Sequence, residues 1–292
     1  MNRQLLERSL GCDLVFIGKG NGVKRETLCE VRKRGTMVSI WYGDIRPTPE
    51  MWLIDLLHET DCYFMTSGGD ELRKHKEQGH CKRAAFFFNP TDPDLPTKYH
   101  HLRRGTTSIV WTGTRHTVVQ DERRKTLEYL QTRNDVQFYG FRQPGTGISG
   151  RLNKLKARLL PQGPPLVRGA DYIAAIKSGK IGVGVSAIQN IPRYSSDRIA
   201  HYTTFGTFYL SWHFPEMELF FDPKRELVSF SSIDDLKTKI DYYLRNEDER
   251  EAMAQAGQKR ALQEYSTQRI TKMMLDVLQN GRSGMFEWEE VI

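Results

Sequence analysis

Short runs of hydrophobic residues alternate with longer polar segments over the first 90 residues of the chain. The short runs are almost continuously apolar, as expected of strands that are buried on both faces of a sheet. The expected strands are 12–17, 37–42, 62–66 and 84–88, and the expected helices are 25–34, 49–58 and 71–78. Strands and helices that alternate at this spacing predict a parallel sheet with right-handed crossover connections.

The alternating pattern breaks at residues 89–96, where the sequence NPTDPDLP contains three prolines and two aspartates. Proline at this density ends regular structure, so we place the link between two domains here, extending to Arg104. A second series follows, with expected strands at 108–112, 136–139, 180–185, 207–211 and 227–230, and helices at 122–133, 170–178 and in two pieces broken near Asn246. The pattern predicts an α/β protein with two Rossmann-like domains, 1–104 and 105–292, that face one another across a ligand-binding cleft.

The stretch DRIAHYTTFGTFYLS, residues 197–211, combines a helix start, a glycine stop and a hydrophobic strand. Side-chain oxygens from residues 194–197 can cap the helix, and Gly206 stands where a left-handed residue ends it. The free amides at such a helix start, with Arg198 in the first turn, favour an anion such as a diphosphate. The alternative is an ordinary capped helix of an α/β domain, because helices commonly begin in this way.

The composition is that of a globular protein, with 38% hydrophobic and 11% aromatic residues among 292. No run approaches the ~18 apolar residues of a membrane span, and the charged start MNRQLLERSL reads as an amphipathic helix and not as a signal peptide. The four cysteines are widely spaced in the first third of the chain, which suits free thiols in a reducing compartment and does not suggest zinc. We therefore expect a cytoplasmic protein.

The formal net charge of +7 favours an anionic partner. A solvated basic surface and a peripheral contact with an anionic membrane, near a lipid-linked acceptor, are both compatible with this charge. Nucleic-acid binding is not expected, because no nucleic-acid module is recognisable and the basic clusters lack regular aromatic interleaving.

The second half of the chain carries motifs in a fixed order. A helix bounded by Arg198 and Gly206 is followed by a hydrophobic strand, a turn with Pro215, Glu218 and Phe221, and a pair of helices. Over residues 106–275 this order and spacing resembles the carboxy-terminal half of glycosyltransferases of the spore-maturation type, relatives of the large group 1 family. In that family the helix has the form Arg-x-Phe-Glu-Ala-x-Ala-Cys-Gly, and the turn has the form Pro-x-x-Glu-x-x-Phe.

The resemblance implies the GT-B architecture and a glycosyltransferase. Such an enzyme moves a sugar from a nucleotide-diphosphate sugar to the hydroxyl group of a glycan, a lipid-linked molecule or another acceptor. The first half looks like the acceptor domain of this family, but it lacks the usual first strand and helix. Either the acceptor domain is shortened, or another chain completes it, as in a homo-oligomer.

Two residues depart from the family pattern. The resemblance places the glutamate that holds the donor ribose at His201, and the acidic residue eight positions earlier at Arg193. A neutral imidazole can accept a hydrogen bond from a ribose hydroxyl, but it supplies no full negative charge. Packing of the helix is the alternative role of His201.

Phosphate binding is the step of glycosyl transfer that the sequence supports best. The turn at 112–115 leaves the first strand of the second domain, where a glycine lets the backbone approach a phosphate and an arginine can form two parallel hydrogen bonds to it. In the expected fold this turn lies opposite the serine-rich helix start. The expected donor-binding residues are Thr112, Gly113, Arg115, Ser195, Ser196, Arg198 and His201. Arg124 matches an arginine of the family, with a surface ion pair as its alternative role.

Asp44 is the expected catalytic base, because it follows a strand on the cleft side, where a carboxylate can take the acceptor proton. Its alternative role is an Asx-type turn. Lys19, after the first strand, is expected on the acceptor side. No Asp-x-Asp motif stands in a suitable loop, so no metal and no other cofactor is expected; in GT-B enzymes arginine, lysine and helix amides commonly replace a metal.

Other functions are compatible with the same fold. A nucleotide-sugar epimerase is one alternative, although it is expected to be longer and to have carboxylates in its cleft. A nucleotide-sugar binding protein without transferase activity is another, because the family glutamate is missing at His201. The last residues, 281–292, are expected to form either a helix that returns to the first domain or a tail that binds a partner.

Overall fold

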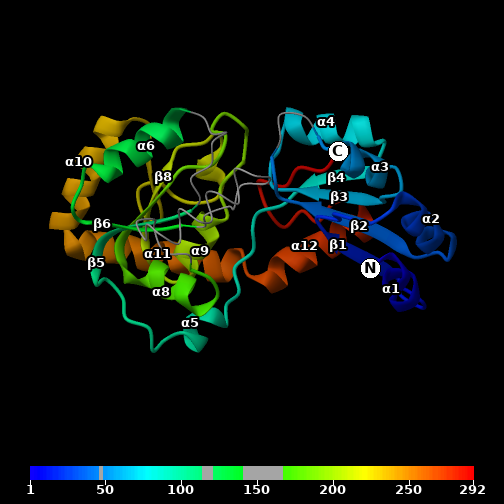
Figure 1. Cartoon of the computed structure of the whole chain (residues 1–292), viewed down its shortest axis with the longest axis horizontal. Coiled ribbons are helices and arrows are strands. Elements are labelled where there is room, and N and C mark those ends of the chain that lie inside the picture. Colours follow the sequence, from blue (N-terminus) through cyan, green and yellow to red (C-terminus); the bar gives the residue numbers. More distant parts are fainter. Residues whose placement is uncertain (46–48, 114–120, 141–166) are drawn as a thin grey trace, which may run out of the picture.

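The computed structural model describes residues 1–45, 49–113, 121–140 and 167–292. Two parallel sheets lie at the centres of two lobes, and helices surround each sheet (Figure 1). Arg115 and most of the expected connection at 144–169 lie outside the described residues. The α/β class with two parallel sheets, expected from the alternating pattern, is confirmed.

The first sheet has four parallel strands in the order β1-β2-β3-β4. The elements of this part of the chain are α1 (Asn2–Arg8), β1 (Leu14–Gly18), α2 (Arg25–Lys33), β2 (Met37–Tyr42), α3 (Met51–Leu57), β3 (Cys62–Met65), α4 (Asp70–Gly79) and β4 (Arg83–Phe86). Each strand pairs with the next one in the sequence, in a register that sets Val15 against Val38. Right-handed crossovers in this order place the connecting helices on one face, so the other face needs a cover from elsewhere in the chain.

Helix α12 (Thr267–Asn280) supplies this cover, although it comes from the far end of the chain. In Figure 1 it lies on the opposite side of the first sheet from α3 and α4. Met273 and Val277 of α12 are buried in the same hydrophobic cluster as Phe64 of β3. The guanidinium of Arg83, at the start of β4, donates to the carbonyl oxygen of Val277 at 2.5 Å.

The final segment, residues 281–292, returns to the first lobe, and its last residues run antiparallel to β4. Ala84 and Ile292 exchange two backbone hydrogen bonds of 2.9 and 2.8 Å. The indole of Trp288 is only 2% exposed and packs edge-on against Phe86. A helix in this segment is not formed, because the unpaired edge of β4 offers backbone partners that favour an extended chain. The final segment of the same chain therefore supplies the first lobe with a partner for the edge of β4 and with a buried tryptophan.

The second sheet has five parallel strands in the order β6-β5-β7-β8-β9. The elements of this part are β5 (Thr107–Thr112), α6 (Asp121–Gln131), β6 (Val136–Tyr139), α8 (Ala170–Ser178), β7 (Gly179–Gly184), α9 (Arg198–Thr204), β8 (Phe208–Trp212), the 3-10 helix η1 (Met217–Leu219), β9 (Val228–Phe230), α10 (Ile233–Arg245) and α11 (Glu247–Glu264). The expected break between the last two helices of this lobe, at Asn246, is confirmed.

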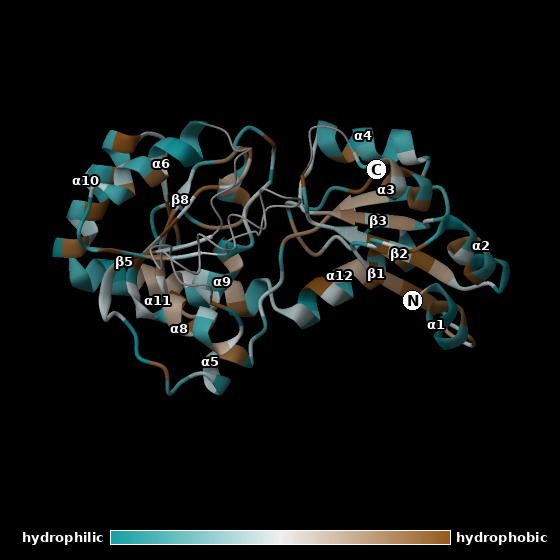
Figure 2. Ribbon diagram, viewed as in Figure 1, coloured by the Kyte–Doolittle hydropathy of each residue, from teal (hydrophilic) through white to brown (hydrophobic). Residues whose placement is uncertain are grey.

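The strands are the hydrophobic centre of each lobe, and the helices turn hydrophilic residues outward (Figure 2). All four residues of β3 are buried. The edge strand β1 is less enclosed, and its Phe16 side chain is 48% exposed. No helix in the described ranges is long and apolar enough to cross a membrane.

Two connections join the lobes. The first, residues 89–104, contains the short helix α5 (Leu95–Lys98), where the sequence predicted no regular structure. Pro96 stands in the first turn of this helix, where a residue without an amide hydrogen is tolerated, so the proline-rich sequence does not prevent it.

The second connection links α11 to α12 and is pinned to the first by Thr91. The Thr91 amide donates to the carbonyl oxygen of Tyr265 at 2.7 Å, and the Thr267 amide donates to the carbonyl oxygen of Thr91 at 2.8 Å. The domain boundary between residues 104 and 105 remains a prediction. By this boundary α12 and the final segment belong to the second domain, but they pack on the first lobe.

Candidate active site

A cavity of about 390 Å³ lies between the two lobes. Its lining residues lie at or just after the carboxyl ends of β1, β2 and β4 on one side, and follow β7 or belong to α9 on the other. They are Lys19, Trp41, Gly43, Asp44, Asn89, Pro90, Tyr194, Ser195, Ser196, Asp197, Ala200 and His201. Ligands of open parallel sheets bind beyond the carboxyl ends of the strands, which makes this cavity the candidate active site.

An ion pair forms the first-lobe wall of the cavity. The Lys19 ammonium and the Asp44 carboxylate lie 2.7 Å apart, and each side chain is about half exposed. Lys19 has a left-handed backbone with φ of 65°, which turns the chain away from β1 at this point. Its amide still donates to the carbonyl oxygen of Trp41 at 2.7 Å. The lysine and the carboxylate expected on the acceptor side are therefore neighbours.

The second-lobe wall is the loop before α9 and the first turns of that helix. Asp197 stands at the N-cap position, but its side chain makes no capping hydrogen bond. The Ser196 hydroxyl instead accepts from the Arg198 amide at 3.4 Å, and the Ser196 amide donates to the Ser186 hydroxyl at 2.9 Å. Gly206 has φ of 62° directly after the helix, as the sequence predicts.

His201 lines the cavity and is paired with Tyr172 of α8. The phenol oxygen lies 3.0 Å from Nδ1 of the imidazole, and the two rings are nearly perpendicular. Burial lowers the pKa of His201 below its ordinary value, and burial raises the pKa of Tyr172 to about 12. At neutral pH the imidazole is therefore uncharged and the phenol is protonated. A phenol that donates to Nδ1 leaves the ring proton of His201 on Nε2, whereas a phenol that accepts from Nδ1 leaves Nε2 as an acceptor.

Two buried arginines lie behind this wall, at the carboxyl end of β5. Arg123 of α6 is 5% exposed and Arg198 of α9 is 9% exposed. Both guanidinium groups lie over the indole of Trp111, and both donate to the carbonyl oxygen of Val185 at 2.7 Å. Burial, and then the charge of Arg198, lowers the pKa of Arg123. Because two like charges are desolvated together, an anion that reaches them gains free energy.

Gly113 makes room for the arginine pair. It has φ of 148°, and a Cβ atom at this position would lie 3.0 Å from Nη1 of Arg198 and 3.1 Å from Nη2 of Arg123. A side chain here would push against both guanidinium groups. The glycine that was expected to let a phosphate approach the backbone therefore also leaves room for the two arginines.

Thr112 and Arg124, two other residues singled out from the sequence, do not line the cavity. The hydroxyl of Thr112 is buried and lies 3.2 Å from the hydroxyl of Tyr202. Arg115 lies outside the described residues. Arg124 is exposed and pairs with Asp121 and Glu128 at 3.0 Å each, which is the alternative role considered for it.

Sequence reasoning did not assign several residues to the site. Trp41, Asn89 and Tyr194 line the cavity, and Arg123 stands beside Arg198. The first three could have been found from their positions at the carboxyl ends of strands or just before α9. Arg123 has no such signal, because its neighbour Arg124 is equally basic and only the phase of α6 decides which of the two points inward.

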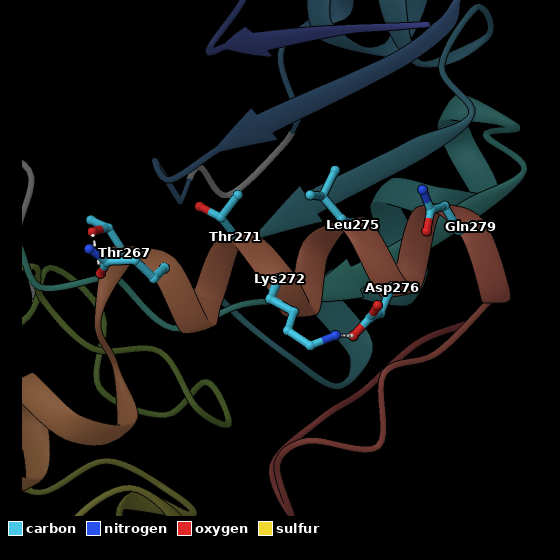
Figure 3. Close-up of a pocket in the computed structure, with 7 residues that line it drawn as sticks. Thr267, Thr271, Lys272, Leu275, Asp276 and Gln279 are labelled. Atoms are coloured by element: carbon cyan, nitrogen blue, oxygen red, sulfur yellow. Dashed lines mark hydrogen bonds and ion pairs between the residues drawn. The ribbon is translucent and has the colours of Figure 1, made fainter.

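A second hollow, of about 520 Å³, runs along α12 and is a weaker candidate (Figure 3). All of its lining residues belong to that one helix, and its charged residues Lys272 and Asp276 pair with each other at 2.9 Å. No polar groups from different elements converge there, as they do in a binding site. Among the described residues, no group of three or more His, Cys, Asp or Glu side chains could hold a metal ion.

Comparison with known proteins defines the class. Residues 145–276 match the family model described as glycosyl transferase-like. The chain resembles the crystal structure of Anabaena Alr3699/HepE in complex with UDP-glucose, with a TM-score of 0.63 and 11% identity over 95% of this chain and 81% of that one. It also resembles a sucrose-phosphate synthase from Thermosynechococcus elongatus, with a TM-score of 0.61 and 12% identity over 94% and 75% of the two chains. A UDP-forming trehalose-phosphate synthase from Burkholderia xenovorans gives a TM-score of 0.61 and 11% identity over 96% and 77%.

A comparison with curated protein sequences finds no match. The structural matches confirm the GT-B fold expected from the sequence, with two facing parallel-sheet domains. The chain thus has the GT-B fold, and its residues 145–276 match a glycosyl transferase-like family model.

Proposed function

We propose that this protein transfers a sugar from a nucleotide-diphosphate sugar to a hydroxyl group of a glycan, a lipid-linked molecule or another acceptor. The observation that carries the proposal is the cavity between the lobes. It is lined from the first lobe by Lys19 and Asp44 and from the second by Ser195, Ser196 and His201. Two lobes that meet at one cavity can hold two substrates and orient them for reaction.

The donor is assigned to the second lobe. The buried guanidinium groups of Arg123 and Arg198 suit the negative charge of a diphosphate, and Gly113 leaves the backbone accessible beside them. The Ser195 and Ser196 region would contact the phosphates from the cavity side. His201 Nε2 could donate a hydrogen bond to a ribose hydroxyl, in place of the accepting glutamate of the related family. The neighbours crystallised with UDP or UDP-glucose make UDP the first nucleotide to test.

The acceptor is assigned to the first lobe. In the proposed step the acceptor oxygen forms a bond to the anomeric carbon, and the bond from that carbon to the diphosphate oxygen breaks. Asp44 would take the acceptor proton, and Lys19, 2.7 Å away, would orient the carboxylate. We further propose that cations of the protein neutralise the leaving diphosphate without a metal; loss of activity on addition of a chelator would contradict this.

A binding assay tests the nucleotide-sugar site directly. We expect one of UDP, GDP or ADP to raise the unfolding temperature, and the matching nucleotide sugar to release that diphosphate when incubated with the protein. No shift and no calorimetric binding with any nucleotide diphosphate would reject the donor site.

Replacement of Arg198 tests where the diphosphate binds. We expect Arg198→Gln to weaken binding of the nucleotide diphosphate by about 10- to 100-fold, because a charge-assisted hydrogen bond worth about 1.5–3 kcal/mol is lost. Arg198→Lys keeps the charge in the same buried place and should bind with intermediate affinity. Arg124→Gln is the matched control, since that arginine is exposed and pairs with Asp121 and Glu128. Unchanged affinity in a folded Arg198→Gln protein would move the phosphate site elsewhere.

A nucleotide-sugar binding protein without transferase activity is the second candidate. Two observations favour this candidate. The imidazole of His201 stands where the related family has a carboxylate, and the carboxylate of Asp44 is already paired with Lys19. Binding of a nucleotide sugar without release of the diphosphate, in the presence of a panel of glycan acceptors, would support it.

The residue pattern supports placing the protein with the spore-maturation type of glycosyltransferases. We also propose a cytoplasmic location, because all four cysteines are free thiols. The net charge of +7 supports a peripheral contact with anionic membranes near a lipid-linked acceptor. We propose no nucleic-acid binding, because no nucleic-acid module is recognisable in the sequence. Sedimentation with anionic vesicles and light scattering would test the membrane contact and a homo-oligomer.

A further inference from the structure

The loop that lines the second-lobe wall of the cavity is fastened to the first lobe just before it enters the cavity. The amide of Gly68, after β3, donates to the carbonyl oxygen of Pro192 at 3.0 Å. The next residue, Arg193, donates from Nη1 to Oε2 of Glu290 at 2.9 Å and to the carbonyl oxygen of Trp288 at 3.2 Å. Residues 194–197, which line the cavity, follow directly.

Glu290 belongs to the final segment and is held firmly on the first lobe. Its carbonyl oxygen accepts from the amide of Phe86 at 2.9 Å. Its carboxylate accepts from the amide of Gly69, at the start of α4, at 2.9 Å. The guanidinium of Arg73 lies 3.9 Å from the other carboxylate oxygen. The carboxylate that meets Arg193 therefore has its own fixed place in the first lobe.

Arg193 is held equally firmly on the second lobe. Its Nε donates to Oε2 of Glu216 at 2.5 Å, and its amide donates to the carbonyl oxygen of Pro215 at 3.0 Å. Its backbone is left-handed, with φ of 63°, a conformation that is unfavourable for a residue with a side chain. Such a conformation persists where surrounding contacts impose it, and it often occurs next to functional sites.

Most of this contact is shielded from water. The side chain of Arg193 is 18% exposed and that of Glu290 is 15% exposed. A Cβ atom on Gly68 would lie 2.6 Å from Oε2 of Glu290 and 3.2 Å from Cδ of Arg193, so the glycine permits the close approach. An ion pair with little solvent is screened less by salt than a pair on the surface.

We propose that Arg193 and Glu290 are positioning residues that set how the two walls of the cavity face each other. The pair ties the start of the 194–197 loop to the same lobe that carries Lys19 and Asp44. This contact between the lobes, the Arg193–Glu290 tie, does not itself depend on the proposed function, whereas its effect on catalysis does. Its loss changes the alignment of donor and acceptor but leaves the arginine pair at Trp111 intact.

The tie is tested by hydrogen exchange of backbone amides in Glu290→Gln, Arg193→Gln and Arg193→Lys. We expect faster exchange of peptides that contain Gly68 and residues 192–196 in the two Gln variants, because the interlobe contacts open more often. Arg193→Lys keeps a cation and should recover part of the protection. Glu287→Gln, which changes an exposed carboxylate of the same segment, is the control and should exchange as the wild type.

The catalytic effect is tested with the nucleotide sugar identified by diphosphate release. We expect kcat to fall about tenfold or more in the Gln variants, because small misplacements of reactants are costly, with the dissociation constant of the free nucleotide diphosphate unchanged. A merely structural pair would lower the unfolding temperature and leave kcat as it is at temperatures where the protein is folded.

The outcomes separate the two proposals. Wild-type exchange rates in both Gln variants would overturn the tie. Faster exchange with an unchanged kcat would overturn the positioning role. If no nucleotide diphosphate binds the wild type, the proposed function fails, while the exchange data still decide whether the tie exists. If Glu290→Gln does not fold, the exchange rates and kcat values of Arg193→Lys and Arg193→Gln decide both whether the tie exists and whether it affects catalysis.

Discussion

Arg198 and Arg123 show what a single residue contributes here. Each is a long basic side chain that would normally reach into water, and each is instead buried on the ring of Trp111. Helix α9 brings one guanidinium and α6 brings the other, and the carbonyl oxygen of Val185 accepts from both. Two guanidinium groups that meet at one carbonyl oxygen concentrate positive charge in one buried place, which favours an anionic ligand.

His75 predicts a dependence of stability on pH. Burial lowers its pKa to about 4 from an ordinary value of 6.5, and the charge of Lys74 adds to this effect. Its Nδ1 meets the hydroxyl of Tyr63 at 3.1 Å, and its Nε2 has no hydrogen-bond partner among the described residues. As pH falls from about 6.5 to 4, the unfolded chain binds a proton at this position before the folded protein does, so stability falls over that window.

The size of this effect is about 3 kcal/mol between neutral pH and pH 4. Urea denaturation of the wild type and of His75→Gln at a series of pH values would measure it. We expect a smaller loss of stability on acidification in the variant. His100→Gln removes an exposed histidine and is the control. Equal pH dependence in His75→Gln and wild type would show that other groups cause the acid sensitivity.

Strand β7 shows how an element is fitted to its neighbours. Its sequence GKIGVG is unusually small for a buried strand, and the reason lies in the aromatic rings beside it. A Cβ atom on Gly182 would lie 2.2 Å from the ring of Tyr202, and one on Gly184 would lie 1.7 Å from the hydroxyl of Tyr209. These two rings stack with their centroids 4.8 Å apart beneath α9, so the glycines set the depth at which that helix packs.

Gly182→Ala should therefore destabilise the second lobe by about 1–3 kcal/mol, because the added methyl group overpacks a filled site. Gly18→Ala is the matched control in a strand of the other lobe, where the nearest atom to an added Cβ lies 3.8 Å away. Denaturation curves of the two variants provide the measurement. A loss of stability as large in Gly18→Ala as in Gly182→Ala would assign the effect to glycine in strands generally.

The two lobes of the whole molecule are joined by chain segments that cross between them twice. Thr91 links the two crossings, and α12 with the final segment completes the first lobe. Trp288 of the final segment makes several of these contacts. Its indole packs on Phe86 and Phe286 and also lies beside Phe220 of the second lobe. The end of the chain is therefore part of the first lobe's hydrophobic core.

Trp288→Ala should destabilise the protein by about 3–5 kcal/mol, the usual range for removing a buried tryptophan side chain. Phe16→Ala, which removes a ring that is 48% exposed, should cost about 1 kcal/mol or less. Calorimetric unfolding of both proteins, with the wild type, would measure the difference. A small effect of Trp288→Ala would show that the final segment is dispensable for the first lobe.

Much of the fold was determined by local patterns in the sequence. Continuous apolar runs identified the strands, and their alternation with helices identified two parallel sheets, because buried parallel strands leave a short-range signature. A strand end identified Asp44, a helix start identified Ser195 and Ser196, and the family resemblance identified Lys19 and His201. All five residues line one cavity.

Only the tertiary structure decided which of two adjacent arginines is buried, how the final segment pairs with β4, and why an arginine stands at position 193. These outcomes depend on contacts between residues far apart in the chain, such as Gly69 with Glu290. Such contacts leave no periodic pattern in the sequence, since each partner is compatible by itself with a solvated loop. Local propensity determined the elements, and the packing of two lobes determined the partners of their side chains.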